Sequence, residues 1–147
     1  MLVEFQQALA DLVARPELCR QIRADPDDLR QRYDLTEREY GRLVAMVNHP
    51  AMECNCMLYR ANRLAPLAMN LHGFCGALGS RLGPLLTEYS ERYPNTNVHF
   101  YAECARFCQF IRAKLEEGYE LDPTARAILE EESARVQVGL AASYTVL

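Results

Sequence analysis

Three side chains that can bind transition metals lie close together in the sequence: His49, Cys54 and Cys56. Thiolate and imidazole groups are the usual protein ligands of zinc and copper. Paired cysteines of a structural zinc site usually have about two to four residues between them, whereas only Asn55 separates this pair. Two interpretations therefore stay open: a small metal- or redox-active site, which folding could complete with Cys75, and partly buried free thiols.

The other residues that could do chemistry give weaker signals. Cys19 and Cys75 have apolar neighbours and no nearby histidine to activate a thiol. Cys104 and Cys108 lie one turn apart on an apolar helical stripe, which predicts buried thiols. The run Glu130–Glu132 is typical of a solvated helix face. No phosphate-binding glycine loop or nucleophile elbow is present, so we predict no catalytic residue in this chain.

The segment that begins at Cys54 mixes arginine, asparagine and tyrosine with apolar residues, a composition typical of protein interfaces. The alternative is an ordinary helix with a polar face. If the segment binds a partner protein, the candidate interface residues are Cys54, Asn55, Cys56, Tyr59, Arg60, Asn62 and Arg63. Among these, Tyr59, Arg60 and Arg63 are the predicted anchors.

The C-terminal tail is rich in residues that favour β-strands. It can be a frayed end, or an exposed strand edge that captures an extended peptide through main-chain hydrogen bonds. In the second case the candidate peptide-binding residues are Val136, Val138, Tyr144 and Val146.

The composition is that of a packed globular chain. Of the 147 residues 50% are apolar and 24% are charged, and the net charge is −4. The basic residues are spread along the sequence, which argues against a nucleic-acid or anionic-membrane partner. The start of the sequence lacks a secretory signal pattern and no apolar stretch is long enough to span a membrane, so we expect a cytoplasmic protein. We expect the six cysteines to be free thiols in that compartment.

Apolar spacing and capping residues predict helices along most of the chain. Early signals are Pro16, the Asp25-Pro26 start and the Thr36/Glu39 capping box. Residues 51–70 predict a short helix with an irregular entry. One later helix is predicted to end before Pro94. The next is predicted to cover 100–115, after the possible caps Asn95, Thr96 and Asn97, and to stop at Gly118. A last helix is predicted to start at Asp122-Pro123. The expected fold is mainly α, a compact single-domain bundle of short helices over 1–147. It comprises a short-helix part (1–50) and a second part (51–147), and the C-terminal tail could form a short strand or hairpin.

A pattern of aromatic and acidic residues surrounds the turn at Pro94. It comprises Leu85-Leu86-Thr87-Glu88-Tyr89, Arg92-Tyr93-Pro94, His99-Phe100-Tyr101-Ala102-Glu103, Phe107 and Phe110-Ile111, followed by Ala127–Glu131. This pattern, over roughly a third of the chain, resembles the small partner subunits of multinuclear non-haem iron-dependent oxidases in peptide natural-product biosynthesis, of the thiaglutamate and methanobactin type.

The resemblance implies a non-catalytic accessory subunit that forms a heterodimer with a barrel-type multinuclear iron oxidase. Such a subunit binds the leader of a ribosomally made precursor peptide and presents a residue, often cysteine, to the oxidase. The iron and its ligands are then expected in the partner enzyme, with no cofactor in this chain. The alternatives are the small metal- or redox-active protein that uses His49, Cys54 and Cys56, and a plain helical adaptor.

Overall fold

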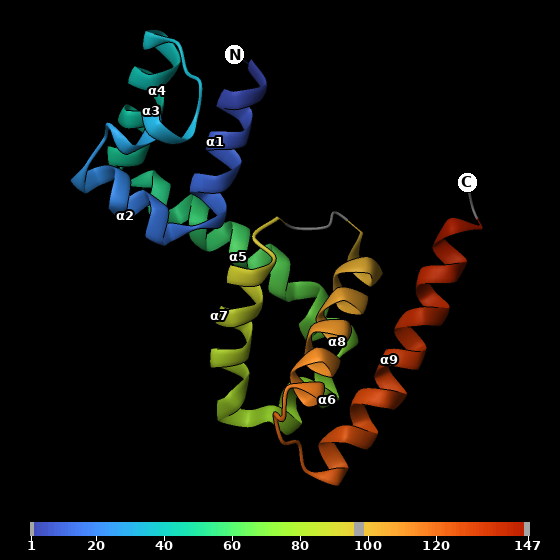
Figure 1. The fold of residues 1–147 in the computed structure, drawn as a ribbon. Coiled ribbons are helices and arrows are strands. Elements are labelled where there is room, and N and C mark those ends of the chain that lie inside the picture. The colour runs from blue at the N-terminus through green and yellow to red at the C-terminus, as the bar shows by residue number, and fades with distance from the viewer. Residues whose placement is uncertain (1, 96–98, 146–147) are drawn as a thin grey trace. The chain divides into compact units, whose positions relative to one another are not determined.

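The computed structural model describes residues 2–95 and 99–145, and it confirms the predicted mainly α fold (Figure 1). These described residues contain no strand. The sequence predicts a single domain over 1–147; within it, contacts between residues cluster into two compact units, Met1–Ala61 and Asn62–Leu147. The boundary falls inside helix α5 (Ala51–Asn70).

The first unit consists of α1 (Leu2–Ala14), α2 (Pro16–Ala24), α3 (Asp28–Arg32), α4 (Glu37–Asn48) and the beginning of α5. Each of these helices turns an apolar stripe toward a shared core, as amphipathic helices do. The core of this unit is formed by Ala8, Leu12, Leu18, Cys19, Ile22, Leu29, Leu43, Val47, Met52 and Cys56.

Local capping chemistry sets most of the helix starts in this unit. Pro16 opens α2, and Thr36 with Glu39 forms the predicted capping box of α4. The predicted start, with Asp25 as N-cap and Pro26 as first residue, is wrong by two residues, because α3 begins at Asp28 with Asp27 as N-cap. The carboxylate of Asp25 instead accepts a hydrogen bond from the Asp27 N–H at 3.2 Å, which shapes the preceding turn.

Helix α5 runs without interruption through the segment for which the sequence predicts only a short helix with an irregular entry. Its entry is regular because the imidazole Nδ1 of His49 accepts a hydrogen bond from the Ala51 N–H at 3.1 Å. Pro66 lies inside the helix, and its carbonyl accepts a hydrogen bond from the Cys104 thiol at 3.2 Å. The helix continues through a residue that usually ends or kinks one, and Cys104 of α8 contacts it there.

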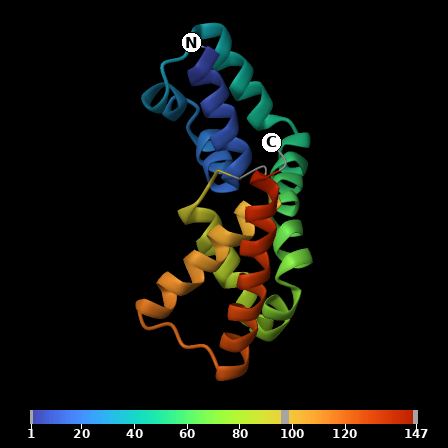
Figure 2. The same ribbon diagram turned by 90° about the vertical axis from the view of Figure 1, so that its right-hand side faces the viewer.

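The second unit contains the end of α5, α6 (His72–Leu78), a 3₁₀ turn η1 (Gly79–Arg81), α7 (Leu82–Arg92), α8 (Phe100–Glu116) and α9 (Pro123–Tyr144). Helix α9 packs against α6 and α8 (Figure 2). An aromatic cluster fills the core: the ring of Tyr89 meets Phe107 edge-on at 5.1 Å and lies 5.5 Å from Phe110. Such tilted and edge-on arrangements are the favoured geometries of aromatic pairs.

The predicted N-cap is confirmed for α9 but not for α8. Asp122 caps α9 as predicted, and its carboxylate accepts a hydrogen bond from the Ala125 N–H at 2.9 Å. The N-cap of α8 is His99, which sequence analysis did not select; of the predicted caps, Asn95 precedes the helix, whereas Thr96 and Asn97 lie outside the described residues. The turn after α8 uses Gly118, whose φ of 95° suits glycine.

The optional C-terminal strand is wrong for the described part of the tail. Residues 136–144 belong to α9, which continues to Tyr144. The tail is helical because Val136 packs into the core and because the Ser143 hydroxyl donates a hydrogen bond to the Gly139 carbonyl at 2.7 Å, within the helix. No helix in the described ranges combines the length and apolar character that crossing a membrane requires.

The position of Glu132 contradicts the prediction that the acidic run Glu130–Glu132 is a solvated helix face. Its side chain is buried, and its two carboxylate oxygens accept hydrogen bonds from the N–H groups of Gly73 at 3.0 Å and Phe74 at 2.9 Å. The carboxylate therefore caps the first turn of α6 from the neighbouring helix α9. Gly73 makes room for it, since a Cβ at this position would lie 2.8 Å from a Glu132 oxygen.

Candidate functional site

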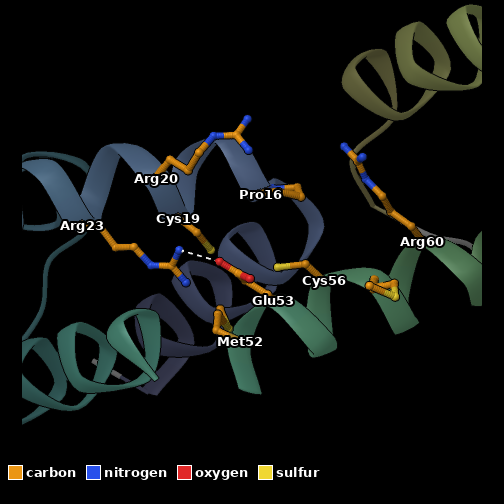
Figure 3. A pocket seen from close by; sticks show the side chains of 9 residues that line it. Pro16, Cys19, Arg20, Arg23, Met52, Glu53, Cys56 and Arg60 are labelled. Carbon is orange, nitrogen blue, oxygen red and sulfur yellow. Dashed lines mark hydrogen bonds and ion pairs between the residues drawn. The ribbon is translucent and has the colours of Figure 1, made fainter. Parts of the chain in front are cut away.

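A pocket of about 290 Å³ opens between α2 and α5 in the first unit (Figure 3). Its apolar lining comes from both helices and consists of Pro16, Cys19, Met52, Cys56 and Met57. Its polar lining consists of Arg20, Arg23, Glu53 and Arg60. The pocket thus combines a sulfur-rich apolar wall with three cations, and its volume is close to the lower end of the roughly 300–1,000 Å³ typical of small-molecule sites.

Two buried thiols, Cys19 and Cys56, form part of this wall and point toward one another (Figure 3). Both donate to the same acceptor, the carbonyl oxygen of Leu12, at 3.0 Å from the Cys19 sulfur and 3.6 Å from the Cys56 sulfur. Burial, followed by the neighbouring Cys56 thiol, raises the pKa of the Cys19 thiol to about 12. Cys19 is therefore a neutral thiol at physiological pH, and it contributes to the wall as a small apolar group.

The three arginines of the pocket differ in how their charges are balanced. Arg23 donates to the Val47 carbonyl at 2.8 Å and to the Glu53 carboxylate at 3.1 Å, so its charge is balanced within the pocket. Arg20 pairs with Glu17 at 3.2 Å on the surface. Arg60 reaches the same Glu17 carboxylate only at 3.9 Å.

Arg60 also carries an unsatisfied donor. Its Nε is buried and, among the described residues, has no hydrogen-bond partner. Buried N–H groups without partners are rare in folded proteins, because each costs about 1–3 kcal/mol. The remainder of the guanidinium group is accessible, since the Arg60 side chain is 40% exposed. Arg60 is therefore a partly exposed cation of this pocket with a donor left for an anion from outside.

The burial of the thiols makes a testable prediction about alkylation. At pH 8, iodoacetamide is expected to modify the exposed Cys54 first, and to modify Cys19 and Cys104 far more slowly, because burial raises the pKa of each of the latter two thiols to about 12. The rates at Cys19 and Cys104 should rise about tenfold per pH unit, as the thiolate fraction does below the pKa.

Peptide mass spectrometry after timed alkylation gives the rate at each cysteine. The chain unfolded in guanidinium chloride serves as the control, because all six thiols are exposed there and should react at similar rates. If Cys19 reacted as fast as Cys54 in the folded chain at pH 8, the neutral, buried state of the thiol wall would be wrong.

The residues predicted for a partner interface separate into two groups. Cys54, Asn55 and Asn62 are exposed along α5, and Tyr59 and Arg60 are partly exposed. Between them lie two large apolar side chains that sequence analysis did not select, Met57 at 69% exposed and Leu58 at 55% exposed. Because a packed helix normally buries such residues, their exposure could not be inferred from the composition of the segment.

Two of the predicted interface residues are corrected by their burial. Cys56 is 5% exposed and belongs to the pocket wall. Arg63 is 3% exposed, and it binds the fully buried carboxylate of Glu103 with an Nη2-to-Oε1 distance of 3.0 Å. Neither side chain can act as a surface anchor without leaving the core. The helical period explains the difference, because both positions lie on the inner side of α5.

The predicted peptide-binding residues also lie in different environments. Val136 is buried at 2% exposed and is corrected to a core residue, whereas Val138 and Tyr144 are 71% and 66% exposed. Val138 and Tyr144 are six positions apart, which places them about 120° apart around the axis of α9. The ring of Tyr144 stacks on His99 with centroids 6.0 Å apart. Val146 lies outside the described residues.

The described ranges of the chain do not provide the ligands that the metal-site hypothesis requires. They contain no group of three or more His, Cys, Asp or Glu side chains that could hold a metal ion. Cys54 faces outward and Cys56 inward, as positions two apart on a helix do. His49 uses its Nδ1 to accept the Ala51 N–H.

Comparison with protein families, curated proteins and solved structures finds no match to this chain.

Proposed function

We propose that this chain is a non-catalytic partner subunit that binds the leader of a ribosomally made precursor peptide and presents one of its residues, with cysteine the expected type, to a barrel-type multinuclear iron oxidase. The chemistry then takes place at iron held by the oxidase. Tethering the leader raises the effective concentration of the substrate residue at that iron site, which accelerates its reaction.

The observation that carries this proposal is the exposed apolar surface of α5. Met57 and Leu58 are adjacent, largely exposed and flanked by Asn55 and Arg60. Large apolar side chains bordered by polar ones mark surfaces that bind other proteins, and methionine and arginine are enriched in such interfaces. We assign the oxidase interface to this surface, which we call the α5 face: Cys54, Asn55, Met57, Leu58, Tyr59 and Arg60.

We assign leader binding to the second unit. There, Tyr144 at the end of α9 is exposed and stacks on His99, and Phe100 at the start of α8 is 55% exposed. Together these rings offer an aromatic surface to an extended or helical peptide. Because α9 is helical to Tyr144, side-chain contacts replace the strand edge that the sequence suggested.

Leader binding is tested with a fluorescently labelled leader of a precursor peptide encoded beside this chain. Tyr144→Ala is expected to weaken binding, measured by anisotropy, by about tenfold, because the ring supplies contact area at little entropic cost. The control is Tyr119→Ala, which removes a partly exposed ring that packs against the core of the same unit, and the melting temperatures of both variants are compared to separate binding from stability. A leader that does not bind the unmodified chain, or binds both variants equally, contradicts this assignment.

A further inference from the structure

We propose that the pocket between α2 and α5 is a binding site for a small amphiphilic carboxylate, a free organic acid with a short apolar chain. The site is separate from the leader-binding role, and most of its lining lies outside both the α5 face and the aromatic surface. Met57 and Arg60 belong to both the α5 face and the pocket.

The charge of the pocket favours an anion. Three arginines line it together with one carboxylate, Glu53, which Arg23 already binds (Figure 3). Glu17, outside the lining, pairs with Arg20 at 3.2 Å. Among the described residues, Arg60 has one acidic partner, Glu17 at 3.9 Å, and its Nε is buried without a hydrogen-bond partner. A carboxylate can accept two parallel hydrogen bonds from an arginine fork, and so can satisfy this donor and the charge together.

The wall of the pocket selects an apolar chain attached to that anion. Met52, Cys19 and Cys56 are each no more than 5% exposed, and Pro16 and Met57 complete the lining. Methionine and neutral thiol groups are polarisable and adapt to the shape of an acyl chain. The volume of about 290 Å³ limits the chain to a short one. A phosphate or sulfate ion would leave this wall unused.

The probe is octanoate, titrated into the full chain by calorimetry and followed by the melting temperature. Octanol has the same chain without charge, octylammonium has the opposite charge, and acetate has the charge without the chain. We expect one octanoate to bind per chain and to raise the melting temperature. The three analogues should bind at least about tenfold more weakly, because each lacks one of the two recognition elements.

Substitutions of Arg60 test whether octanoate binding depends on the charge of this side chain and not on an altered fold. Arg60→Gln should weaken octanoate binding by about tenfold, and Arg60→Lys should recover only part of the loss because lysine lacks the fork. Arg38→Gln is the control, since it removes the same charge from an exposed position of α4 outside the pocket. Circular dichroism of each unliganded variant checks that the fold is kept.

Several results would overturn the proposal. Equal binding of octanoate and octanol would reduce the pocket to an apolar surface, and equal binding of octanoate and acetate would reduce it to a simple ion site. Unchanged affinity in Arg60→Gln would remove Arg60 from the site. If octanoate fails to bind while a short peptide with a C-terminal leucine carboxylate binds, the occupant is a peptide and the free-acid assignment is wrong.

Discussion

Replacing Glu103 by leucine is expected to destabilise the chain by about 3–5 kcal/mol, since it leaves a buried cation without its partner. Glu103 is fully buried, and its carboxylate accepts hydrogen bonds from Arg63 at 3.0 Å, from the Tyr89 hydroxyl at 2.6 Å and from Arg106 at 2.8 Å. Arg63 is 3% exposed and cannot turn to solvent, whereas Arg106 is 27% exposed and can. The free energy of unfolding in urea measures the effect.

Two further variants test whether the cost arises from the unpaired charge. Removing both charges in Glu103→Leu/Arg63→Met should recover much of the lost stability, as apolar replacements of buried ion pairs do elsewhere. Glu88→Ala breaks the partly exposed pair between Glu88 and Lys114 and should cost less than about 1 kcal/mol. A Glu103→Leu variant as stable as Glu88→Ala would show that the buried network does not hold this unit together.

Introducing charge on the α5 face is expected to abolish co-purification with the oxidase. In Met57→Asp/Leu58→Asp, two exposed apolar side chains become carboxylates that would have to be desolvated in the complex. Hot-spot truncations cost about 2 kcal/mol or more each, so the double variant should bind at least roughly a hundredfold more weakly. Surface plasmon resonance with immobilised oxidase measures the affinity.

The control is Val3→Asp, which places a carboxylate at an apolar residue of α1 that is 75% exposed. It should bind the oxidase like the unmodified chain, and the melting temperatures of both variants should stay close to that of the parent because exposed positions tolerate substitution. Retained affinity in the double variant would remove the α5 face from the interface and leave the oxidase to dock elsewhere.

Much of the fold follows from local sequence signals. The Thr36/Glu39 capping box and the Asp122-Pro123 start lie where the helices begin, and Gly118 adopts the positive φ that its position requires. These features depend on residues a few positions apart, so the sequence contains them. Continuous α5 does not follow in the same way, because Pro66 normally ends or kinks a helix and local signals therefore predict a break there.

The candidate site could be predicted only in part, because its main features join residues far apart in the chain. The sequence predicts Cys56 as a partner of Cys54, yet its neighbour is Cys19 from another helix. The sequence predicts Arg63 as a surface anchor, yet it binds Glu103, forty positions away. Glu132 belongs to an acidic run and nevertheless caps α6 from within the core. In each case the deciding partner is tertiary, and periodicity alone does not identify it.

The residues that carry the family resemblance are mostly structural. Tyr89, Glu103, Phe107 and Phe110 are fully or almost fully buried, and they form the aromatic core and its charged network. The resemblance therefore bears on how the second unit packs. The proposed contacts with oxidase and leader lie on exposed residues outside this core, so they need tests of their own.

The most direct test of the proposed function is conversion of the precursor peptide by the iron oxidase with and without this chain. The two proteins and the peptide encoded together are combined with oxygen and reductant, and the peptide mass is followed over time. The proposal predicts modification only when this chain is present, and its loss with the Met57→Asp/Leu58→Asp variant. Equal conversion by the oxidase alone would contradict the role of this chain as a partner subunit.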